Sequence, residues 1–262
     1  MTSPPESPRE SPRNSVHVFP DIEALSRAAA QHIVSHMDRV LSEADRYTLA
    51  LAGGSTPRRL YELLTGVYSG DLPWKQVHVF WGDERFVPHD DPNSNVRLAR
   101  ETLLDHVDIP EGNVHPIPTE TEPTAEAAAR AYAATLQRAF DSPASTFDAA
   151  LLGVGSDGHT ASLFPPLDRT DAPSDPSAPE AWAKASQAPP EASPRTRVTC
   201  TLPVLNGARQ ALVLASGSRK QEALHRVLAD PDPSLPAAQI QPRSQLSWFL
   251  DAAAQPPGLS AS

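Results

Sequence analysis

The sequence has little cysteine and no long apolar run, and each shortage excludes a class of protein. Cys200 is the one cysteine among 262 residues, so the chain cannot form an internal disulfide framework or a zinc cluster built from cysteines. No apolar run approaches the roughly 18 residues that a membrane-spanning helix needs. The first residues, Met1 to Asn14, are rich in Pro, Ser, Glu and Arg and lack the apolar segment of a secretory signal. We therefore expect a soluble, cytoplasmic protein with no membrane partner.

Basic residues are also in deficit. Lysine and arginine together number 22 against 32 acidic residues, which gives a formal net charge of −10. Binding to a phosphate backbone needs a basic surface, so we do not expect a nucleic acid as the main partner. Small anions stay open as ligands, because a few backbone amides and cations can bind a phosphate on an acidic protein. No group of residues has the spacing of a standard metal site, so we expect no metal.

Proline is the residue in excess, at 29 of 262 residues, but it is concentrated in a few places. These are residues 1–20, 165–194, 231–242 and 256–257. The sequence between them has an ordinary composition for a folded domain. We expect a disordered tail at 1–15, a single domain over 16–252 that carries a Pro-rich loop at 165–194, and a frayed C-terminus at 253–262.

Apolar runs alternate with amphipathic patterns along the domain. Short apolar runs predict strands at 16–19, 47–52, 77–81, 147–154, 197–203 and 211–215, and a last short element at 246–250. Apolar residues at three- and four-residue steps and helix-start signals predict helices at 22–41, 57–64, 93–104, 124–140 and 218–228. The alternation, with central strands that are apolar throughout, favours an α/β fold: an open, mostly parallel sheet with helices on both faces.

The first motif follows the second predicted strand and reads LAGGSTPR (51–58). Gly53 and Gly54 allow a tight turn and the close approach of a ligand. Ser55 and Thr56 offer hydroxyls, and a helix that starts at Pro57 directs free N–H groups into the loop, which together would make an anion site. An ordinary strand–turn–helix with Ser and Thr caps is an equal alternative.

The second motif, WGDERFVP (81–88), places three charged residues directly after a buried strand. A solvated surface loop before an Asn-capped helix is the ordinary interpretation of such a run. The aromatic residues and Val87 beside the charges favour a loop that is held in place, with Asp83, Glu84 and Arg85 in fixed directions.

The third motif, GVGSDGHTASLFP (153–165), places His159 two residues after Asp157 in a glycine-rich strand end. A carboxylate beside an imidazole can fix its tautomer and raise its basicity, and a histidine that titrates near pH 7 suits proton transfer. One histidine among nine is more often an ordinary surface or core residue. The glycine frame, at the edge of the sheet where ligands gather in α/β folds, favours a functional role.

Taken together, the motifs resemble the 6-phosphogluconolactonase family, within the wider group of sugar-phosphate isomerases that includes glucosamine-6-phosphate deaminase. Four blocks in the same order carry the resemblance: ALAGGSTPRRLYELL (50–64), VFWGDERFVPHDDPNSN (79–95), FDAALLGVGSDGHTASLFP (147–165) and RVTCTLPVLNGARQALVLASGSRKQEAL (197–224). The resemblance implies a modified Rossmann-like domain. It also implies hydrolysis of 6-phospho-D-glucono-1,5-lactone, the second step of the oxidative pentose phosphate pathway, with no metal or organic cofactor.

The resemblance also implies roles for particular residues. His159 is similar to the family's general base, Asp157 to the acid that orients it, and Arg85 to the arginine beside the lactone. The residues that resemble the family's phosphate site are Gly53, Gly54, Ser55, Thr56, Arg58, Arg197 and Lys220. The expected partner is a small sugar-phosphate lactone, and the expected assembly is a monomer or a weak homo-oligomer.

Two other functions stay open. A deaminase or isomerase acting on glucosamine 6-phosphate needs a carboxylate base, and Asp83 could serve as one. The deaminases have a tyrosine where this chain has Arg85 and a different segment after the histidine, which favours the lactonase. A non-catalytic regulator that binds sugar phosphates is the other alternative, and the intact set of Asp157, His159 and Arg85 speaks against it.

Overall fold

A six-stranded parallel sheet forms the central layer of the protein. The computed structural model describes residues 13–68, 72–167 and 175–259. The strands lie in the order β1-β9-β8-β5-β2-β3, and every neighbouring pair is parallel. Their bounds are β1 (Arg13–Phe19), β9 (Gln245–Asp251), β8 (Gln210–Ala215), β5 (Ala149–Gly153), β2 (Tyr47–Leu51) and β3 (Val77–Trp81). The prediction of an open, mostly parallel sheet is confirmed.

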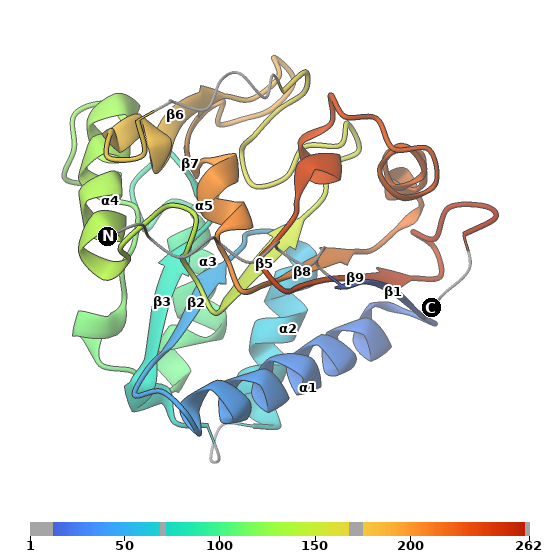
Figure 1. Cartoon of the computed structure of the whole chain (residues 1–262), viewed down its shortest axis with the longest axis horizontal. Helices are drawn as coiled ribbons and strands as arrows, with labels where there is room; N and C mark the ends of the chain where they lie inside the picture. Colours follow the sequence, from blue (N-terminus) through green and yellow to red (C-terminus); the bar gives the residue numbers. More distant parts are fainter. Residues whose placement is uncertain (1–12, 69–71, 168–174, 260–262) are drawn as a thin grey trace, which may run out of the picture.

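Helices cover this sheet on both sides (Figure 1). On one side α1 (Ile22–Leu41) packs against α2 (Ser55–Gly66), which in turn contacts α3 (Asn95–Thr102). On the other side lie α4 (Ala125–Ala139) and the short α5 (Leu202–Asn206). Because both faces are covered, the central strands β2 and β8 are buried along their whole length, which explains their continuous apolar sequences.

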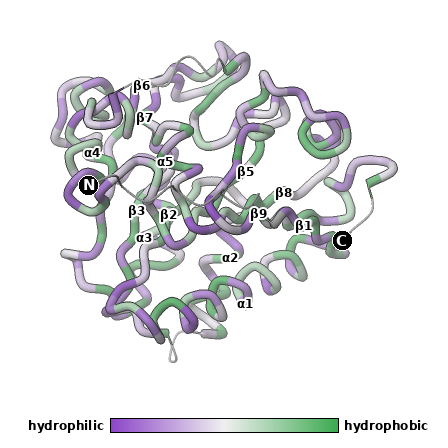
Figure 2. Tube along the Cα trace, viewed as in Figure 1, coloured by the Kyte–Doolittle hydropathy of each residue, from purple (hydrophilic) through white to green (hydrophobic). Residues whose placement is uncertain are grey.

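The long helix α1 shows how the sequence determines where a helix begins. The side chain of Asp21 caps the helix by accepting a hydrogen bond of 2.8 Å from the backbone N–H of Ala24. Leu25, Ala29 and Ile33 form part of a fully buried stripe, and Figure 2 shows hydrophobic and hydrophilic residues alternating along the helix. None of the helices in the part of the chain that the structure describes is long and apolar enough to cross a membrane.

A second, three-stranded antiparallel sheet was not predicted. It consists of β4 (Asp83–Arg85), β7 (Thr196–Cys200) and β6 (Ala183–Gln187), with β7 in the middle. The prediction of a plain Pro-rich loop at 165–194 was therefore wrong for β6 and for the single helical turn Pro179–Ala181 before it; residues 168–174 lie outside the described residues. The sequence AKASQ has little intrinsic strand preference, so it is pairing with β7 that makes this segment a strand.

Several predicted boundaries also needed correction. The predicted strand 197–203 ends at Cys200, because Pro203 stands in the first turn of α5, where proline is well tolerated. The predicted helix 218–228 is a chain of short turns: Ser218–Lys220 (3-10), α6 (Gln221–Leu224) and His225–Ala229 (π). Further 3-10 turns lie at Trp74–Gln76, Leu104–His106, Glu111–Asn113 and Pro236–Gln239.

Both predicted chain ends contain more structure than expected. The disordered tail was predicted to extend to residue 15, but residues 13–15 pair with β9; residues 1–12 lie outside the described part. Fraying was predicted from residue 253 on, but the backbone N–H groups of Ala254 and Gln255 both donate to the carbonyl of Asp251, and Ala254 is completely buried. Residues 260–262 lie outside the described part.

The buried histidine His36 makes the stability of this fold depend on pH. Its Nδ1 lies 2.9 Å from the hydroxyl of Tyr47, and burial lowers the pKa of His36 from 6.5 to about 3. Between these values the unfolded chain binds a proton that the folded chain does not. The free energy of unfolding should therefore fall as the pH drops from about 6.5 to about 3, by up to about 1.4 kcal/mol per pH unit from this group.

The variant His36→Asn tests this linkage. Urea titrations at several pH values between 7 and 4 should show a shallower loss of stability in the variant than in the parent chain. The exposed His225→Asn is the matched control and should keep the parent's slope. Parallel slopes for His36→Asn and the parent would contradict the prediction, whatever the stability of the variant at pH 7.

Candidate active site

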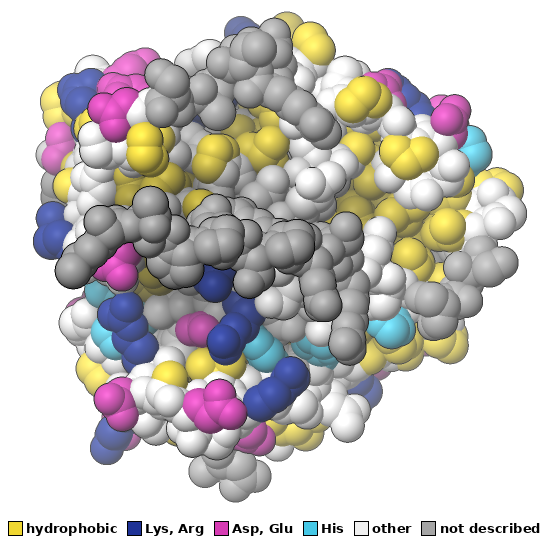
Figure 3. All heavy atoms as spheres, viewed as in Figure 1, with side chains coloured by type: hydrophobic (Ala, Val, Ile, Leu, Met, Phe, Trp, Pro, Cys, Tyr) yellow, Lys and Arg dark blue, Asp and Glu magenta, His cyan; other side chains and the backbone are white. Residues whose placement is uncertain are grey.

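A pocket of about 270 Å³ lies at the carboxyl ends of β2, β3 and β5. Parallel strands end at the same edge of the sheet, which brings the three sequence motifs together here. Of the predicted site residues, the pocket is lined by Gly53, Gly54, Arg85, His159 and Lys220. Figure 3 shows lysine and arginine side chains gathered near acidic and histidine side chains on the viewed face.

His159 and Asp157 form a hydrogen-bonded pair at the edge of the pocket. The Nδ1 atom of His159 lies 2.6 Å from Oδ1 of Asp157, which also accepts the backbone N–H of His159 at 3.2 Å. Burial alone would raise the pKa of Asp157, but the hydrogen bonds from His159 outweigh it and the pKa is lowered. An ionised Asp157 holds the proton on Nδ1, which leaves Nε2 of His159 as the basic nitrogen.

Gly155 makes room for this pair. A Cβ atom at position 155 would lie 2.1 Å from Nδ1 of His159 and 2.3 Å from Oδ1 of Asp157. The backbone also closes the turn, because the N–H of Gly155 donates to the carbonyl of His159. The glycine is therefore required by the packing of the two side chains, and its φ lies outside the left-handed region that favours glycine.

The second motif is held in place, as its neighbouring apolar residues indicated. The fully buried carboxylate of Glu84 accepts hydrogen bonds from the backbone of Arg85, Asn95 and Val96 and from the hydroxyl of Ser94. Burial raises the pKa of Glu84, and these four donors act against that rise. Since two of the donors belong to the first turn of α3, Glu84 joins β4 to the N-terminus of that helix.

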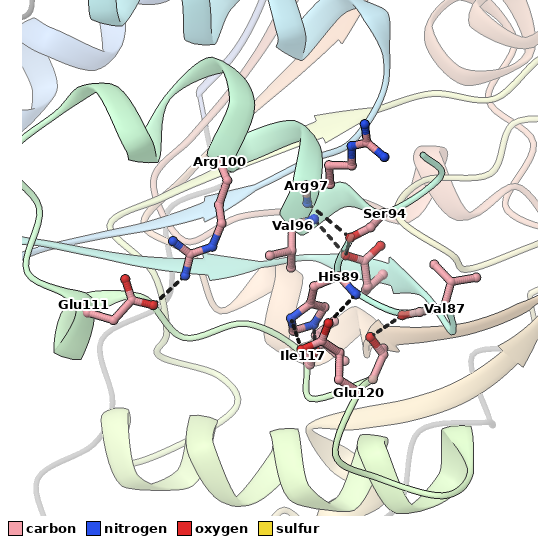
Figure 4. A network of polar contacts seen from close by, with 11 residues as sticks. Val87, His89, Ser94, Val96, Arg97, Arg100, Glu111, Ile117 and Glu120 are labelled. Atoms are coloured by element: carbon pink, nitrogen blue, oxygen red, sulfur yellow. Dashed lines mark hydrogen bonds and ion pairs between the residues drawn. The ribbon is translucent and has the colours of Figure 1, made fainter. Parts of the chain in front are cut away.

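The far end of the same loop is fastened by a separate polar network (Figure 4). His89 donates its backbone N–H to Glu120 at 2.8 Å, and its Nε2 lies 2.9 Å from the carbonyl oxygen of Ile117. The hydroxyl of Thr119 donates to the carbonyl of Val87 at 2.6 Å. These bonds attach the loop to the segment after residue 114. The backbone that carries Arg85 is therefore held in place.

Arg85 and Arg197 lie side by side. They are directly opposite each other in the antiparallel pair of β4 and β7, so their side chains project from the same face. Arg85 donates to the carbonyl of Asn93 at 2.5 Å, whereas the buried Nε of Arg197 has no partner among the described residues. Burial, and then the charge of Arg85, lowers the pKa of Arg197. Among the described residues, no carboxylate is in ion-pair contact with either guanidinium group, and two such adjacent groups suit an anionic ligand.

Lys220 reaches the pocket from the turn that follows β8. Burial, and then the neighbouring Arg219, lowers its pKa, while Asp157 acts in the opposite direction. Within the described residues its ammonium group forms no ion pair. In the strand order, β8 and β3 lie on either side of the pair β5 and β2. Lys220 follows β8 and Arg85 follows β3, so the two positive groups lie on opposite sides of the pocket.

The other predicted phosphate residues lie near the pocket without lining it. Ser55 and Thr56 form the first turn of α2, directly after Gly54, whose φ of 107° requires a glycine. Arg58 points instead toward Glu101 on α3, at 3.7 Å, and is half exposed. Arg197 is buried beside Arg85 rather than on the pocket wall.

Two lining residues with polar side chains, Asp83 and Asn95, were not among the predicted site residues. Asp83 accepts a hydrogen bond of 2.5 Å from the hydroxyl of Ser162, which ties the second motif to the third. Asn95 donates to the carbonyl of Asp83, and a Cβ at Gly53 would lie 1.8 Å from its Oδ1. The sequence offered Asp83 only as a possible base of the rival deaminase. The contacts of Asp83 with Ser162 and of Asn95 with Gly53 join residues far apart in the chain, so no local pattern could place Asn95 at the pocket.

Comparisons with known proteins identify the family of the chain. Residues 20–248 match the family model described as glucosamine-6-phosphate isomerases/6-phosphogluconolactonase. The chain belongs to this family. It is 38% identical over 247 residues to a 6-phosphogluconolactonase of Nostoc sp., which covers 92% of this chain and 97% of the relative. It is 36% identical to the 6-phosphogluconolactonase of Mycobacterium tuberculosis, over 91% of this chain and 96% of the relative.

Solved structures of the family have the same fold. A 6-phosphogluconolactonase from Thermotoga maritima superposes with a TM-score of 0.77 at 32% identity, covering 91% of this chain and 100% of that one. A monomeric glucosamine-6-phosphate deaminase superposes with a TM-score of 0.75 at 20% identity, over 92% and 98% of the two chains. The second likeness shows that both activities of the family occur on one fold, so the fold alone does not choose between them.

Gly155→Ala tests whether the His159–Asp157 pair depends on the space above this glycine. The added methyl group must push the two side chains apart, so kcat should fall by about tenfold or more because the imidazole loses its orientation. Steady-state kinetics would measure the effect. Gly112→Ala is the control, because a Cβ there meets nothing within 4 Å. A folded Gly155→Ala with the parent's kcat would contradict the assignment.

Proposed function

We propose that this protein hydrolyses 6-phospho-D-glucono-1,5-lactone to 6-phospho-D-gluconate. The observation that carries the proposal is the His159–Asp157 pair on a pocket that also holds Arg85 and Lys220. In one cavity, His159 supplies a base, Arg85 supplies a positive group for an oxyanion, and Lys220 supplies a cation for a phosphate. The membership of the chain in the family, and its lactonase relatives at 36–38% identity, support the same activity.

We infer that the phosphate lies between Lys220 and the start of α2. The first turn of a helix presents free N–H groups and the positive end of its dipole, and Gly54 lets the backbone approach the ligand. Arg197 adds a buried positive charge on the side of Arg85. When the phosphate is anchored at one end of the pocket, the lactone ring extends toward His159. The reacting carbon of the lactone is then held close to the base.

In this proposal, His159 acts twice. Its Nε2 removes a proton from water as the water oxygen attacks C1 of the lactone, and a tetrahedral oxyanion forms. The intermediate then collapses, the bond between C1 and the ring oxygen breaks, and Nε2 returns the proton to that oxygen. The products are the carboxylic acid, which ionises, and a free hydroxyl, so no other reactant is consumed. Asp157 stabilises the imidazolium between the two steps.

We assign the stabilisation of the oxyanion to Arg85. Backbone N–H groups of the glycine run 153–158 are the alternative donors, but two of them are already used. The N–H of Gly155 donates to His159 and that of Gly158 donates to Gly155. Arg85 keeps further N–H groups after its bond to Asn93, and it is one of the residues that line the pocket.

His159→Ala is the first test of this mechanism. Loss of the general base should lower kcat by about 10² to 10⁴, with little change in KM, because the alanine removes proton transfer and leaves the phosphate contacts intact. The assay couples product formation to NADP⁺ reduction by 6-phosphogluconate dehydrogenase, with the spontaneous hydrolysis of the lactone subtracted. His225→Ala, on the surface, is the control. An unchanged kcat in His159→Ala would exclude the assigned role.

The phosphate contacts are tested separately. Lys220→Ala should raise KM by about tenfold or more, since a lost hydrogen bond to a charged group costs about 1.5–3 kcal/mol. Arg197→Ala should raise KM by a smaller factor, because Arg197 lies beside Arg85 and does not line the pocket. Lys75→Ala, which removes an exposed lysine paired with Asp108, should leave KM unchanged. A variant with the parent's KM would remove that residue from the phosphate site. Release of ammonia from glucosamine 6-phosphate by the parent chain would instead favour the deaminase.

A further inference from the structure

Asp251, at the end of β9, carries a buried carboxylate that the proposed reaction does not use. It is only 6% exposed. Its oxygens accept the hydroxyl of Ser216, the backbone N–H of Gly217 at 3.0 Å and the backbone N–H of Ala254 at 2.8 Å. Every one of these donors lies in a turn next to a strand end, and two of them belong to the turn that follows β8. The carboxylate thus joins the ends of β8 and β9.

The turn held by Asp251 is the one that delivers Lys220. Gly217 has a φ of 91°, which requires a glycine, and it begins the 3-10 helix Ser218–Lys220. The backbone N–H of Lys220 donates to the carbonyl of Gly217 at 3.1 Å. The N-cap residue of this short helix is Gly217, which has no side chain to cap it, so the hydrogen bonds to Asp251 are what fix its start.

The ammonium group of Lys220 depends on this backbone for its position. Lys220 lines the pocket, and in the described part of the chain its ammonium group has no ion pair that would hold it there. Asp251 is not among the charges that shift the pKa of Lys220, which are those of Arg219 and Asp157. Asp251 therefore acts on the turn and not on the lysine charge.

We propose that Asp251 is a positioning residue that sets the affinity for the phosphate group through Lys220. The inference rests on the proposed function, because it takes the phosphate of the substrate as the partner of Lys220. Asp251 is not among the residues that line the pocket. Its removal should let the Ser216–Lys220 turn shift, and small displacements of a binding group weaken an interaction strongly.

Two substitutions at position 251 separate position from charge. Asp251→Ala removes every acceptor and should raise KM for the phosphorylated lactone about tenfold, with kcat within about twofold of the parent. Asp251→Asn should stay close to the parent, because its oxygen can still accept from Gly217 and Ala254 while its amide donates to the hydroxyl of Ser216. Asp175→Ala is the matched control: Asp175 likewise accepts the N–H and hydroxyl of a serine, Ser177, but lies outside the pocket.

A double-mutant cycle shows whether the effect passes through Lys220. In the background of Lys220→Ala, the added Asp251→Ala should change KM by less than about twofold, because the group that it positions is gone. Equal effects in both backgrounds would overturn the inference, as would an unchanged KM in a folded Asp251→Ala. If Asp251→Ala fails to fold, Ser216→Ala removes one of the same bonds and enters the cycle in its place, and additive effects would again overturn the inference. A parent chain that does not hydrolyse the lactone would refute the proposed function instead.

Discussion

The parallel direction of the six central strands is the constraint on which the site depends. All of these strands end at one edge, so the segments that follow β2, β3, β5 and β8 meet there although they are far apart in sequence. With β5 placed between β2 and β8, the pair of His159 and Asp157 comes to lie between the glycine loop and Lys220. An antiparallel neighbour would have sent one of these segments to the opposite edge. The small second sheet adds to this edge by setting Arg197 beside Arg85.

The positive charges at this edge of the sheet destabilise the protein when no ligand is bound. Arg85 and Arg197 are like charges opposite each other in a ladder, and burial disfavours the charged forms of Arg197 and Lys220. Neither the buried Arg197 nor the half-buried Lys220 has a carboxylate in ion-pair contact among the described residues. An anionic ligand would offset both the repulsion and the lost hydration. The chain as a whole is acidic, with a net charge of −10. The excess of positive charge at this edge is therefore local to the site and does not reflect the composition of the chain.

Local patterns in the sequence were sufficient for the parts of the fold that local physics controls. The Asp21 cap and the apolar stripe of α1 predicted that helix to its first residue, and the apolar runs predicted the central strands. They failed where long-range pairing decides. The segment at β6 becomes a strand only because β7 is available, and Arg58 turns away because Glu101 on α3 lies within reach. Asn95 could not be placed in the site from its own surroundings, since its contact with Gly53 crosses from α3 to the end of β2.

The glycines of the site show most clearly how sequence and geometry are joined. At Gly54 and Gly217 the backbone itself needs the residue, because φ is positive. At Gly53 and Gly155 the backbone would accept other residues, and it is a neighbouring side chain that excludes them: Asn95 in one case and the pair of His159 and Asp157 in the other. The two kinds cannot be distinguished in the sequence, where all four simply follow strands. Glycines such as Gly53 and Gly155 carry more information about function. Each of them is needed only as long as the side chain packed against it stays at that position.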